Sequence, residues 1–333
     1  MSLTIALAGD TMLGRGVGDE ITATGPENLF SGEVRDCIAS ADLTVVNLEC
    51  CISARGSPWD SPGKLFHFRA PPQAAAALAR LGVNCVTLAN NHTLDFGYTA
   101  FADTLGHLSA TGIAVTGAGT NLEHARSPAI LQAAGLRVAI LGITDHPSDF
   151  AATADNPGAA YAHLAGGVPA WLTDQVAALA EANVAVVVMP HWGPNMTLGP
   201  LPYIRRAARA LTQAGATLVA GTSAHLFHGI AGQVLFDLGD FIDDYATDPD
   251  LRNDLGLLFL VTLDGQRMGR VEAVPLKLRY ARTELAAIAD RAWIRDRFTR
   301  ACATFGTSVH DRNGRLVAQP GPGPEPGPRP RGL

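Results

Sequence analysis

Short apolar runs alternate along the chain with segments rich in Ala and Leu at helical spacing. The apolar runs predict β-strands, and the segments between them predict amphipathic helices. Strands are predicted at 3–9, 43–47, 83–88, 137–143, 184–189, 216–220, 233–237, 256–263 and 270–276, and helices at 72–81, 97–111, 168–182 and 201–214. The run VAVVVM at 184–189 is typical of a strand buried on both faces. Because the gaps between strands can hold crossover helices, the pattern indicates an α/β fold.

The composition is that of a chain that folds unaided, with 47% hydrophobic and 17% charged residues. Five cysteines are an odd number without framework spacing, which predicts a reducing compartment. The chain starts directly with an apolar strand-like run, and no stretch reaches membrane-spanning length. These features predict a cytoplasmic protein without a membrane segment. We expect a single domain over 1–318 and a disordered Pro/Gly-rich tail over 319–333.

Side chains that can bind metals follow the predicted strands one after another. They are Asp10, Glu49, Asn91, His92, His191 and His225. The carboxyl ends of strands in α/β folds converge on one crevice, so we expect these groups to meet there. Carboxylate, imidazole and amide donors suit one or two ions of Zn, Mn or Fe. They match neither a thiolate site nor an all-oxygen calcium site. Such ions can generate hydroxide near neutral pH.

Structural roles compete with chemical ones at several of these positions. Asp10 could form an Asx-turn after its strand, and Asn91 could satisfy backbone groups of its loop. Asp95 is predicted to cap the helix that begins near residue 96 or 97. Arg15 could clamp an anionic group or form a surface ion pair. His228 could be a strand or loop histidine without a role in the site.

Several ordered motifs give a more specific signal. They are AGDTMLGR (8–15), ADLTVVNLE (41–49), FRAPP (68–72), LGVNCVTLANNHTLDFG (81–97), TGAG (116–119), PHWG (190–193), GTSAH (221–225) and the segment 234–241 that ends in LGDF. With these motifs the chain resembles, from about Ile5 to about Leu263, the CapA or poly-γ-glutamate capsule synthesis protein family. That family's domain belongs to the calcineurin-like metallophosphoesterase superfamily. The resemblance therefore implies a four-layer αββα sandwich with a two-metal centre.

The resemblance also implies a role for each residue that matches a family motif. It implies Asp10 and His225 as ligands of a first metal, Glu49 as a bridging ligand, and Asn91 and His191 as ligands of a second metal. It also implies His92 as the catalytic residue, beside the leaving group or the reacting oxygen. Arg15 and Asp240 are predicted to contact the substrate.

The chain departs from the family pattern at four positions. Met12 stands where the superfamily usually has a histidine ligand, and Thr222 and Ser223 stand where the family commonly has one or two histidines. Asp240 replaces the usual asparagine. One metal could therefore bind weakly or be missing.

Three functions are compatible with these features. The first is a metal-dependent hydrolase, in which an ion-bound hydroxide attacks a phosphoester or an amide such as a γ-glutamyl linkage. The second is an accessory protein of capsule polymer synthesis, which the missing ligands favour and the retained His92, His191 and His225 disfavour. The third is an enzyme that modifies a small metabolite, since no membrane anchor is evident. The predicted metal ions would attract an anionic small molecule or polymer as substrate, despite the chain's net charge of −6. No basic run or patch indicates a nucleic-acid partner, and no feature indicates the number of subunits.

Overall fold

A computed structural model describes residues 2–61 and 64–319, and two large β-sheets organise it. In the larger sheet, a path of eight neighbouring strands runs β19 (Ser308–Arg312), β20 (Arg315–Gln319), β17 (Arg267–Arg279), β16 (Leu255–Asp264), β1 (Ser2–Thr11), β2 (Leu43–Leu48), β5 (Cys85–Thr87) and β6 (Ala114–Thr116). Two further strands join this path, β15 (Asp240–Ile242) beside β1 and β18 (Arg282–Leu285) beside β17.

The smaller sheet contains the strands of the middle of the chain. Its order is β13 (Ile230–Ala231), β14 (Val234–Leu235), β12 (Leu218–Ala220), β11 (Ala185–His191), β9 (Leu136–Thr144) and β8 (Ala129–Ala133). Two short pairs are separate from both sheets, β3 (Cys51–Ile52) with β4 (Arg69–Ala70) and β7 (Ala118–Gly119) with β10 (Gly158–Ala159).

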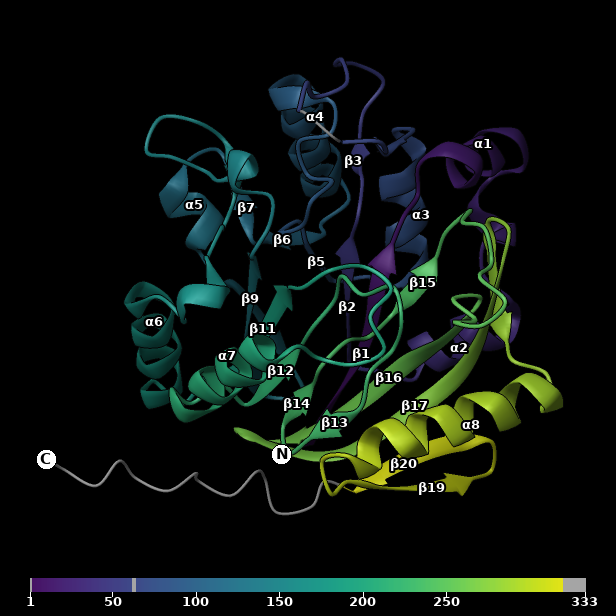
Figure 1. Cartoon of the computed structure of the whole chain (residues 1–333). Coiled ribbons are helices and arrows are strands. Elements are labelled where there is room, and N and C mark those ends of the chain that lie inside the picture. The colour runs from purple at the N-terminus through teal and green to yellow at the C-terminus, as the bar shows by residue number, and fades with distance from the viewer. Residues whose placement is uncertain (1, 62–63, 320–333) are drawn as a thin grey trace, which may run out of the picture.

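Helices cover the outer faces of both sheets (Figure 1). The α-helices are α1 (Arg15–Thr24), α2 (Gly32–Ala39), α3 (Gln73–Leu81), α4 (Gly97–Ala110), α5 (Leu122–Arg126), α6 (Ala170–Glu181), α7 (Pro202–Gln213) and α8 (Ile288–Ala303). Short 3₁₀ turns occur at Pro26–Asn28, Ser148–Phe150 and Leu164–Gly166. Every predicted strand and helix overlaps an element of the same type.

Side-chain alternation along the strands builds the layers. In β1, Leu3, Ile5 and Leu7 enter a cluster between the two sheets, whereas Ala6 and Ala8 face the outer cluster with α2, α3 and α4. The strands of the smaller sheet alternate in the same way, with α6 and α7 on its outer face. Successive residues of a strand point to opposite faces, so each central strand packs on both sides. This arrangement confirms the predicted four-layer α/β sandwich.

Phe298→Ala in α8 is expected to lower the free energy of unfolding by about 3–5 kcal/mol, the usual cost of truncating a core aromatic ring. The Phe298 ring is fully buried, with its centroid 6.1 Å from that of Phe227 and 6.0 Å from that of Phe259. Urea denaturation measures the change. Arg295→Ala on the exposed face of the same helix is the control, with an expected change within about 0.5 kcal/mol. Equal effects of the two substitutions would contradict a core role for α8.

The parallel parts of both sheets bring their carboxyl ends together. In the larger sheet β1, β2, β5 and β6 are parallel, and in the smaller sheet β9, β11 and β12 are parallel. The side chains of Asp10 at the end of β1 and His191 at the end of β11 approach to 3.9 Å. The two sheets therefore share one edge at which polar side chains can combine.

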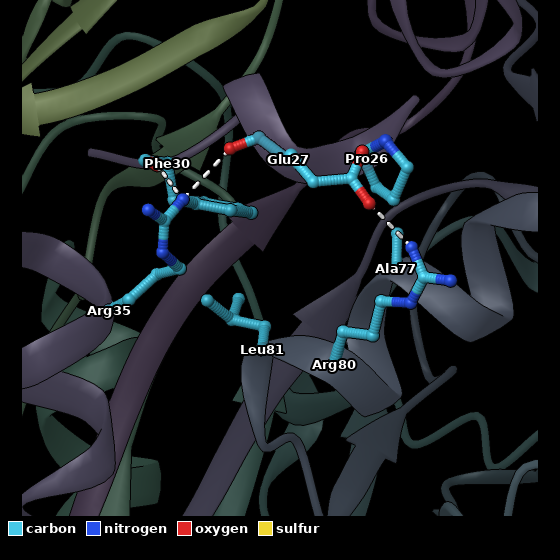
Figure 2. Close-up of a pocket in the computed structure, with 7 residues that line it drawn as sticks. All are labelled: Pro26, Glu27, Phe30, Arg35, Ala77, Arg80 and Leu81. Atoms are coloured by element: carbon cyan, nitrogen blue, oxygen red, sulfur yellow. Dashed lines mark hydrogen bonds and ion pairs between the residues drawn. The ribbon is translucent and has the colours of Figure 1, made fainter. Parts of the chain in front are cut away.

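A small hollow of about 150 Å³ lies between α2, α3 and the turn at 26–28 (Figure 2). Arg35 donates to the backbone oxygens of Glu27 and Phe30, and Arg80 pairs with the Glu27 carboxylate at 2.6 Å. The two guanidinium groups thus hold the turn against the helices, which is a packing role.

The division into a single domain over 1–318 and a disordered tail over 319–333 stays a prediction. Gln319, the first residue of the predicted tail, is the last residue of β20, and 320–333 lie outside the described residues. Among the helices that the structure describes, none is long and apolar enough to cross a membrane.

Candidate metal centre

The strand ends bring together the predicted ligand residues. Asp10 belongs to β1, Glu49 directly follows β2, and Asn91 lies in the turn after β5. His191 is the last residue of β11, and His225 lies in the loop after β12. The sheets hold their ends rigidly, so side chains at these positions are well placed for chemistry. Their roles as ligands stay a prediction.

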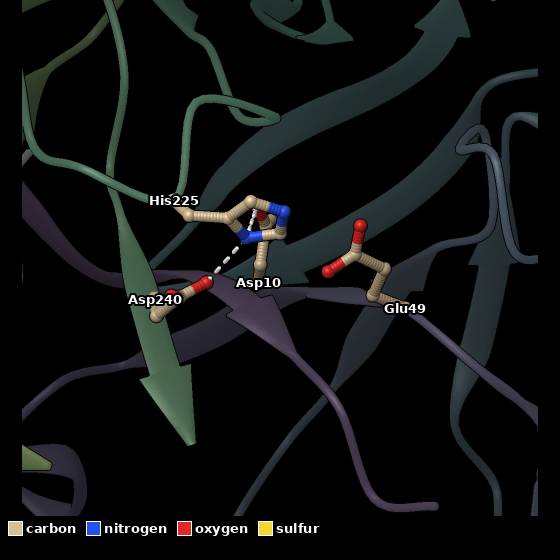
Figure 3. Close-up of side chains that lie close together, drawn as sticks. All are labelled: Asp10, Glu49, His225 and Asp240. Atoms are coloured by element: carbon tan, nitrogen blue, oxygen red, sulfur yellow. Dashed lines mark hydrogen bonds and ion pairs between the residues drawn. The ribbon is translucent and has the colours of Figure 1, made fainter. Parts of the chain in front are cut away.

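Four acidic or histidine side chains form the centre of this site (Figure 3). Asp10, Glu49, His225 and Asp240 each offer a ligand atom, and these atoms lie within 4.8 Å of one another. His225 Nδ1 is 2.8 Å from Asp240 Oδ1 and 3.4 Å from Asp10 Oδ2. The sequence predicted Asp240 as a substrate contact, whereas the structure places it inside this ligand cluster.

The Glu49 carboxylate is the most unusual group of the cluster. Its side chain is 0% exposed, and within residues 2–61 and 64–319 neither carboxylate oxygen has a hydrogen-bond partner. Burial, followed by the charge of Asp10, raises the pKa of Glu49 well above its usual value. An unpaired buried carboxylate is costly, and a bound cation removes that cost. Carboxylate oxygens and a histidine nitrogen therefore fit a divalent transition metal.

The charge balance around His225 supports the same interpretation. Burial acts to lower the pKa of His225, but the carboxylates of Asp240, Glu49 and Asp10 outweigh it and raise the pKa well above normal. Burial likewise raises the pKa of Asp10 and of Asp240. Three acidic groups so close together need positive charge among them.

A second group of donors lies next to Glu49. His191 Nε2 is 2.9 Å from Asn91 Oδ1 and 3.8 Å from Glu49 Oε1. The other ring nitrogen, Nδ1, lies 2.9 Å from the Thr222 hydroxyl, which orients the ring. Burial, with smaller effects from neighbouring histidines, lowers the pKa of His191 well below its usual value, so the ring is neutral as a metal ligand requires.

His92 also lies close to Glu49. Its Nδ1 lies 2.6 Å from Asp95 Oδ2, and its Nε2 is 4.0 Å from Glu49 Oε1. Burial lowers the pKa of His92 to about 4. The Asp95 carboxylate also accepts a hydrogen bond from the Phe68 backbone N–H at 2.6 Å and pairs with Lys64 at 2.7 Å.

The prediction that Asp95 caps a helix is wrong. Helix α4 begins at Gly97 after Phe96, and no side chain of the described residues caps its first turn. The Asp95 carboxylate is occupied by His92, Lys64 and the Phe68 backbone instead, because the turn before α4 folds back towards the site.

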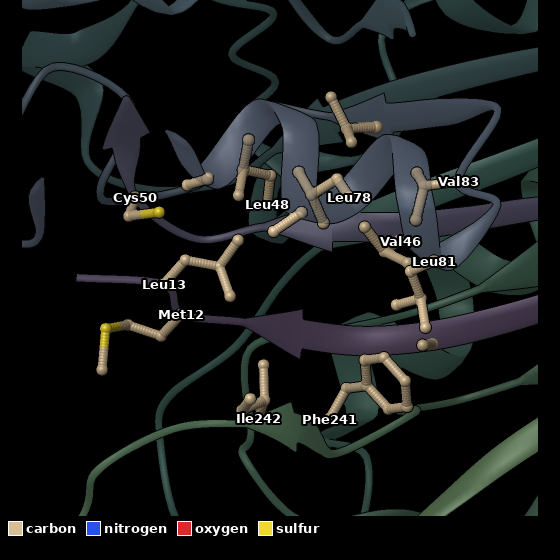
Figure 4. Close-up of a cluster of buried hydrophobic side chains, with 14 of the residues drawn as sticks. Met12, Leu13, Val46, Leu48, Cys50, Leu78, Leu81, Val83, Phe241 and Ile242 are labelled. Atoms are coloured by element: carbon tan, nitrogen blue, oxygen red, sulfur yellow. The ribbon is translucent and has the colours of Figure 1, made fainter. Parts of the chain in front are cut away.

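Three of the four positions that depart from the family pattern, Met12, Thr222 and Ser223, have structural roles. Met12 is buried in the hydrophobic cluster on the outer face of the larger sheet (Figure 4), and its sulfur accepts from the Gly14 N–H. The Ser223 N–H donates to Asp10 Oδ2 at 3.3 Å, and the Ser223 hydroxyl donates to the Gly193 carbonyl. Ser223 thus helps to orient Asp10, and Thr222 helps to orient His191.

Sequence reasoning missed two asparagines that support the cluster. Asn47 donates to Asp10 Oδ1 at 2.7 Å, and Asn90 donates to Asn47 Oδ1 at 3.0 Å. Both stand at strand ends within the motifs, so their position was a usable signal. His228, a further histidine of this region, contacts the Thr197 carbonyl and lies outside the cluster.

Arg15 lies at the outer side of the site, where it pairs with Asp244. Across the site, the His146 and His191 rings lie with centroids 5.3 Å apart. Asp145, which directly follows β9, accepts from the Tyr203 hydroxyl at 2.7 Å.

The motifs and this geometry can be compared with known proteins. Residues 4–245 match a family described as bacterial capsule synthesis protein PGA_cap. The chain belongs to this family. Membership confirms the CapA resemblance that the motifs predicted.

Relatives of the PGA_cap chain carry names from polymer synthesis. A protein of Mycobacterium tuberculosis named "Probable polyglutamine synthesis accessory protein" is 29% identical, over 95% of each chain. The PGA biosynthesis protein CapA of Bacillus subtilis is 27% identical, over 84% of this chain and 72% of the relative. Among solved structures, the NAD nucleotidase of Haemophilus influenzae matches with a TM-score of 0.44 at 11% identity, over 84% of this chain and 50% of that one.

Proposed function

We propose that this PGA_cap chain is a metal-dependent hydrolase that cleaves a phosphoester or an amide such as a γ-glutamyl linkage. The buried Glu49 carboxylate carries the proposal, because both its oxygens lack hydrogen bonds within the described chain and face other ligand-type atoms. A structural carboxylate in a folded core would be paired. A divalent cation at the cluster gives Glu49 its missing partner.

Two sets of residues would hold the metal. Asp10, His225 and Asp240 offer ligand atoms within 4.8 Å of that of Glu49, and Asn91 lies beside His191, whose Nε2 is 3.8 Å from Glu49 Oε1. Glu49 is the residue common to both sets. When bound, the metal would supply Lewis acidity and activate a water molecule.

The chain's own residues supply proton transfer. His92 presents Nε2 towards Glu49, while Asp95 fixes the other ring nitrogen. The His92 ring can exchange a proton with the reacting oxygen or nitrogen at Nε2, and the Asp95 carboxylate stabilises the ring while it carries a positive charge.

Glu49→Gln tests the proposal, because the amide keeps the size of the side chain and removes its charge. We expect the wild-type protein to retain Zn²⁺ or Mn²⁺ after dialysis, and the variant to lose at least about tenfold in metal affinity. Elemental analysis and calorimetry measure both. Glu123→Gln, on the surface at the start of α5, is the control. Equal metal affinity in Glu49→Gln and wild type would contradict the proposal.

Activity is assayed on a phosphodiester, a phosphomonoester and a γ-glutamyl amide. We expect turnover of at least one of the three, and loss of that turnover in Glu49→Gln but not in Glu123→Gln.

A second candidate function is an accessory role in polymer synthesis without catalysis. The name of the mycobacterial relative favours it, as do Met12, Thr222 and Ser223 at positions where ligands are expected. Metal binding without turnover of any of the three substrates would support this second candidate.

A further inference from the structure

A cavity of about 350 Å³ opens directly beside the metal-type cluster. His92 and His225 line its inner end, where the cluster begins. Its side walls are formed by Phe66, Phe68, Met196 and Tyr245, with Arg15 at the outer side. The cavity therefore shares two histidines with the site, but most of its walls are apolar or aromatic.

Aromatic rings cover the histidines on the cavity side. The Phe68 ring stacks on His92 with centroids 4.0 Å apart, and Tyr245 meets His225 edge-on at 5.5 Å. Phe66 continues this surface, stacked at 6.5 Å from Phe68. Stacked rings thus lead from His92 through Phe68 to the exposed Phe66.

Two apolar side chains of the wall are open to solvent. Phe66 is 58% exposed and Met196 is 36% exposed. They come from different loops and line the same cavity. Exposed apolar surface grouped around a polar site is typical of a surface that a ligand covers.

Arg15 adds a positive charge to this apolar wall. Its guanidinium lies 4.8 Å from the Phe68 ring centroid and 5.4 Å from that of Tyr245. Its hydrogen bonds to Asp244 use Nε and Nη2, so among the described residues Nη1 has no partner. A guanidinium held by a carboxylate and by rings is a rigid donor for an incoming anion.

We infer that the site takes an organic anion whose acidic or phosphoryl group carries an apolar, planar substituent. The anionic group lies between the metal-type cluster and Arg15, and the substituent packs against Phe66, Phe68 and Met196. This inference rests on the proposed function for the identity of the site and adds the class of its substrate. A ligand with only polar groups would leave the apolar wall uncovered.

Calorimetric titration with phenylphosphonate and methylphosphonate, in the presence of Mn²⁺, tests the inference. The two anions have the same head group, and their P–C bonds resist hydrolysis, so binding is measured without turnover. We expect phenylphosphonate to bind at least about tenfold more tightly, because only its ring can bury apolar surface on the wall. In the double variant Phe66→Ala/Met196→Ala the difference should fall below about threefold.

The matched control is Leu65→Ala/Leu198→Ala. These two side chains are 83% and 66% exposed on the same two loops and do not line the cavity. The control should keep the wild-type difference, and all variants should keep the wild-type metal content. Equal affinities for the two anions in the wild type, no binding of either, or a difference that survives in Phe66→Ala/Met196→Ala would each overturn the inference. A tenfold difference in a protein that turns over no substrate would retain the inference and contradict the hydrolase function alone.

Discussion

His191→Ala is expected to lower metal affinity by more than the roughly 10–100-fold that the loss of an outer partner of a metal ligand costs. The His191 ring is buried and neutral, and its Nε2 faces Asn91 and Glu49. It also ends a strand that is buried along its whole length, which holds the ring in place. Elemental analysis of protein dialysed against metal-free buffer, with calorimetric titration of Zn²⁺ and Mn²⁺, measures the loss.

His228→Ala is the matched control for this substitution. His228 is also a buried histidine, but it contacts the Thr197 carbonyl and lies outside the cluster. We expect this variant to lose stability and to keep its metal. Equal metal content in His191→Ala and wild type, or equal losses in the two histidine variants, would contradict the assignment of His191 as a ligand.

The periodicity of the sequence predicts the central elements because their burial is regular. The strand β11 is apolar from Ala185 to Pro190 and is buried on both faces, as predicted from VAVVVM. Helix α8 was missed because only Ile294, Phe298 and Cys302 of its residues are buried, among many charged ones. Their spacing of four residues is a helical signal, but too few apolar positions carry it.

Much of the site can be predicted from the residues that follow the strands, and the reason is physical. Parallel strands of one sheet end at one edge, which brings together Asp10 of β1 and Glu49 after β2. His191 ends β11 of the smaller sheet and joins them because the two sheets pack with these edges together. The surroundings of Asp95 depend instead on the path of the loop that carries Lys64 and Phe68. Sequence periodicity contains no information on such a path, and the local rule for helix caps therefore gave the wrong role.

The position of Asp240 in the ligand cluster also could not be predicted from the sequence. It pairs in register with Asp10 across the short contact of β15 with β1. A three-residue strand gives a weak signal, so the sequence could not show which carboxylate of the segment at 240–244 enters the cluster.

His92→Ala is expected to lower kcat by about 10²–10⁴-fold and to keep the metal. The His92 ring lies 4.0 Å from Glu49 but is bonded to Asp95, so its removal takes away a proton-transfer group and leaves the ligand cluster complete. Steady-state kinetics with the substrate that the wild type turns over, beside elemental analysis, measures both effects. Loss of metal in His92→Ala with unchanged metal in His191→Ala would reverse the two assignments.

Asp95→Asn tests whether Asp95 acts through His92. The amide has nearly the same size, but it no longer provides the negative charge that stabilises the protonated ring, so we expect a lower kcat with unchanged metal content. The decisive variant is the double substitution His92→Ala/Asp95→Asn. If Asp95 only positions and stabilises His92, the double variant should be no slower than His92→Ala, because residues that act as one unit are not additive. A further loss of kcat in the double variant, equal to that of Asp95→Asn alone, would show that Asp95 works independently, through its contacts to Lys64 and the Phe68 backbone.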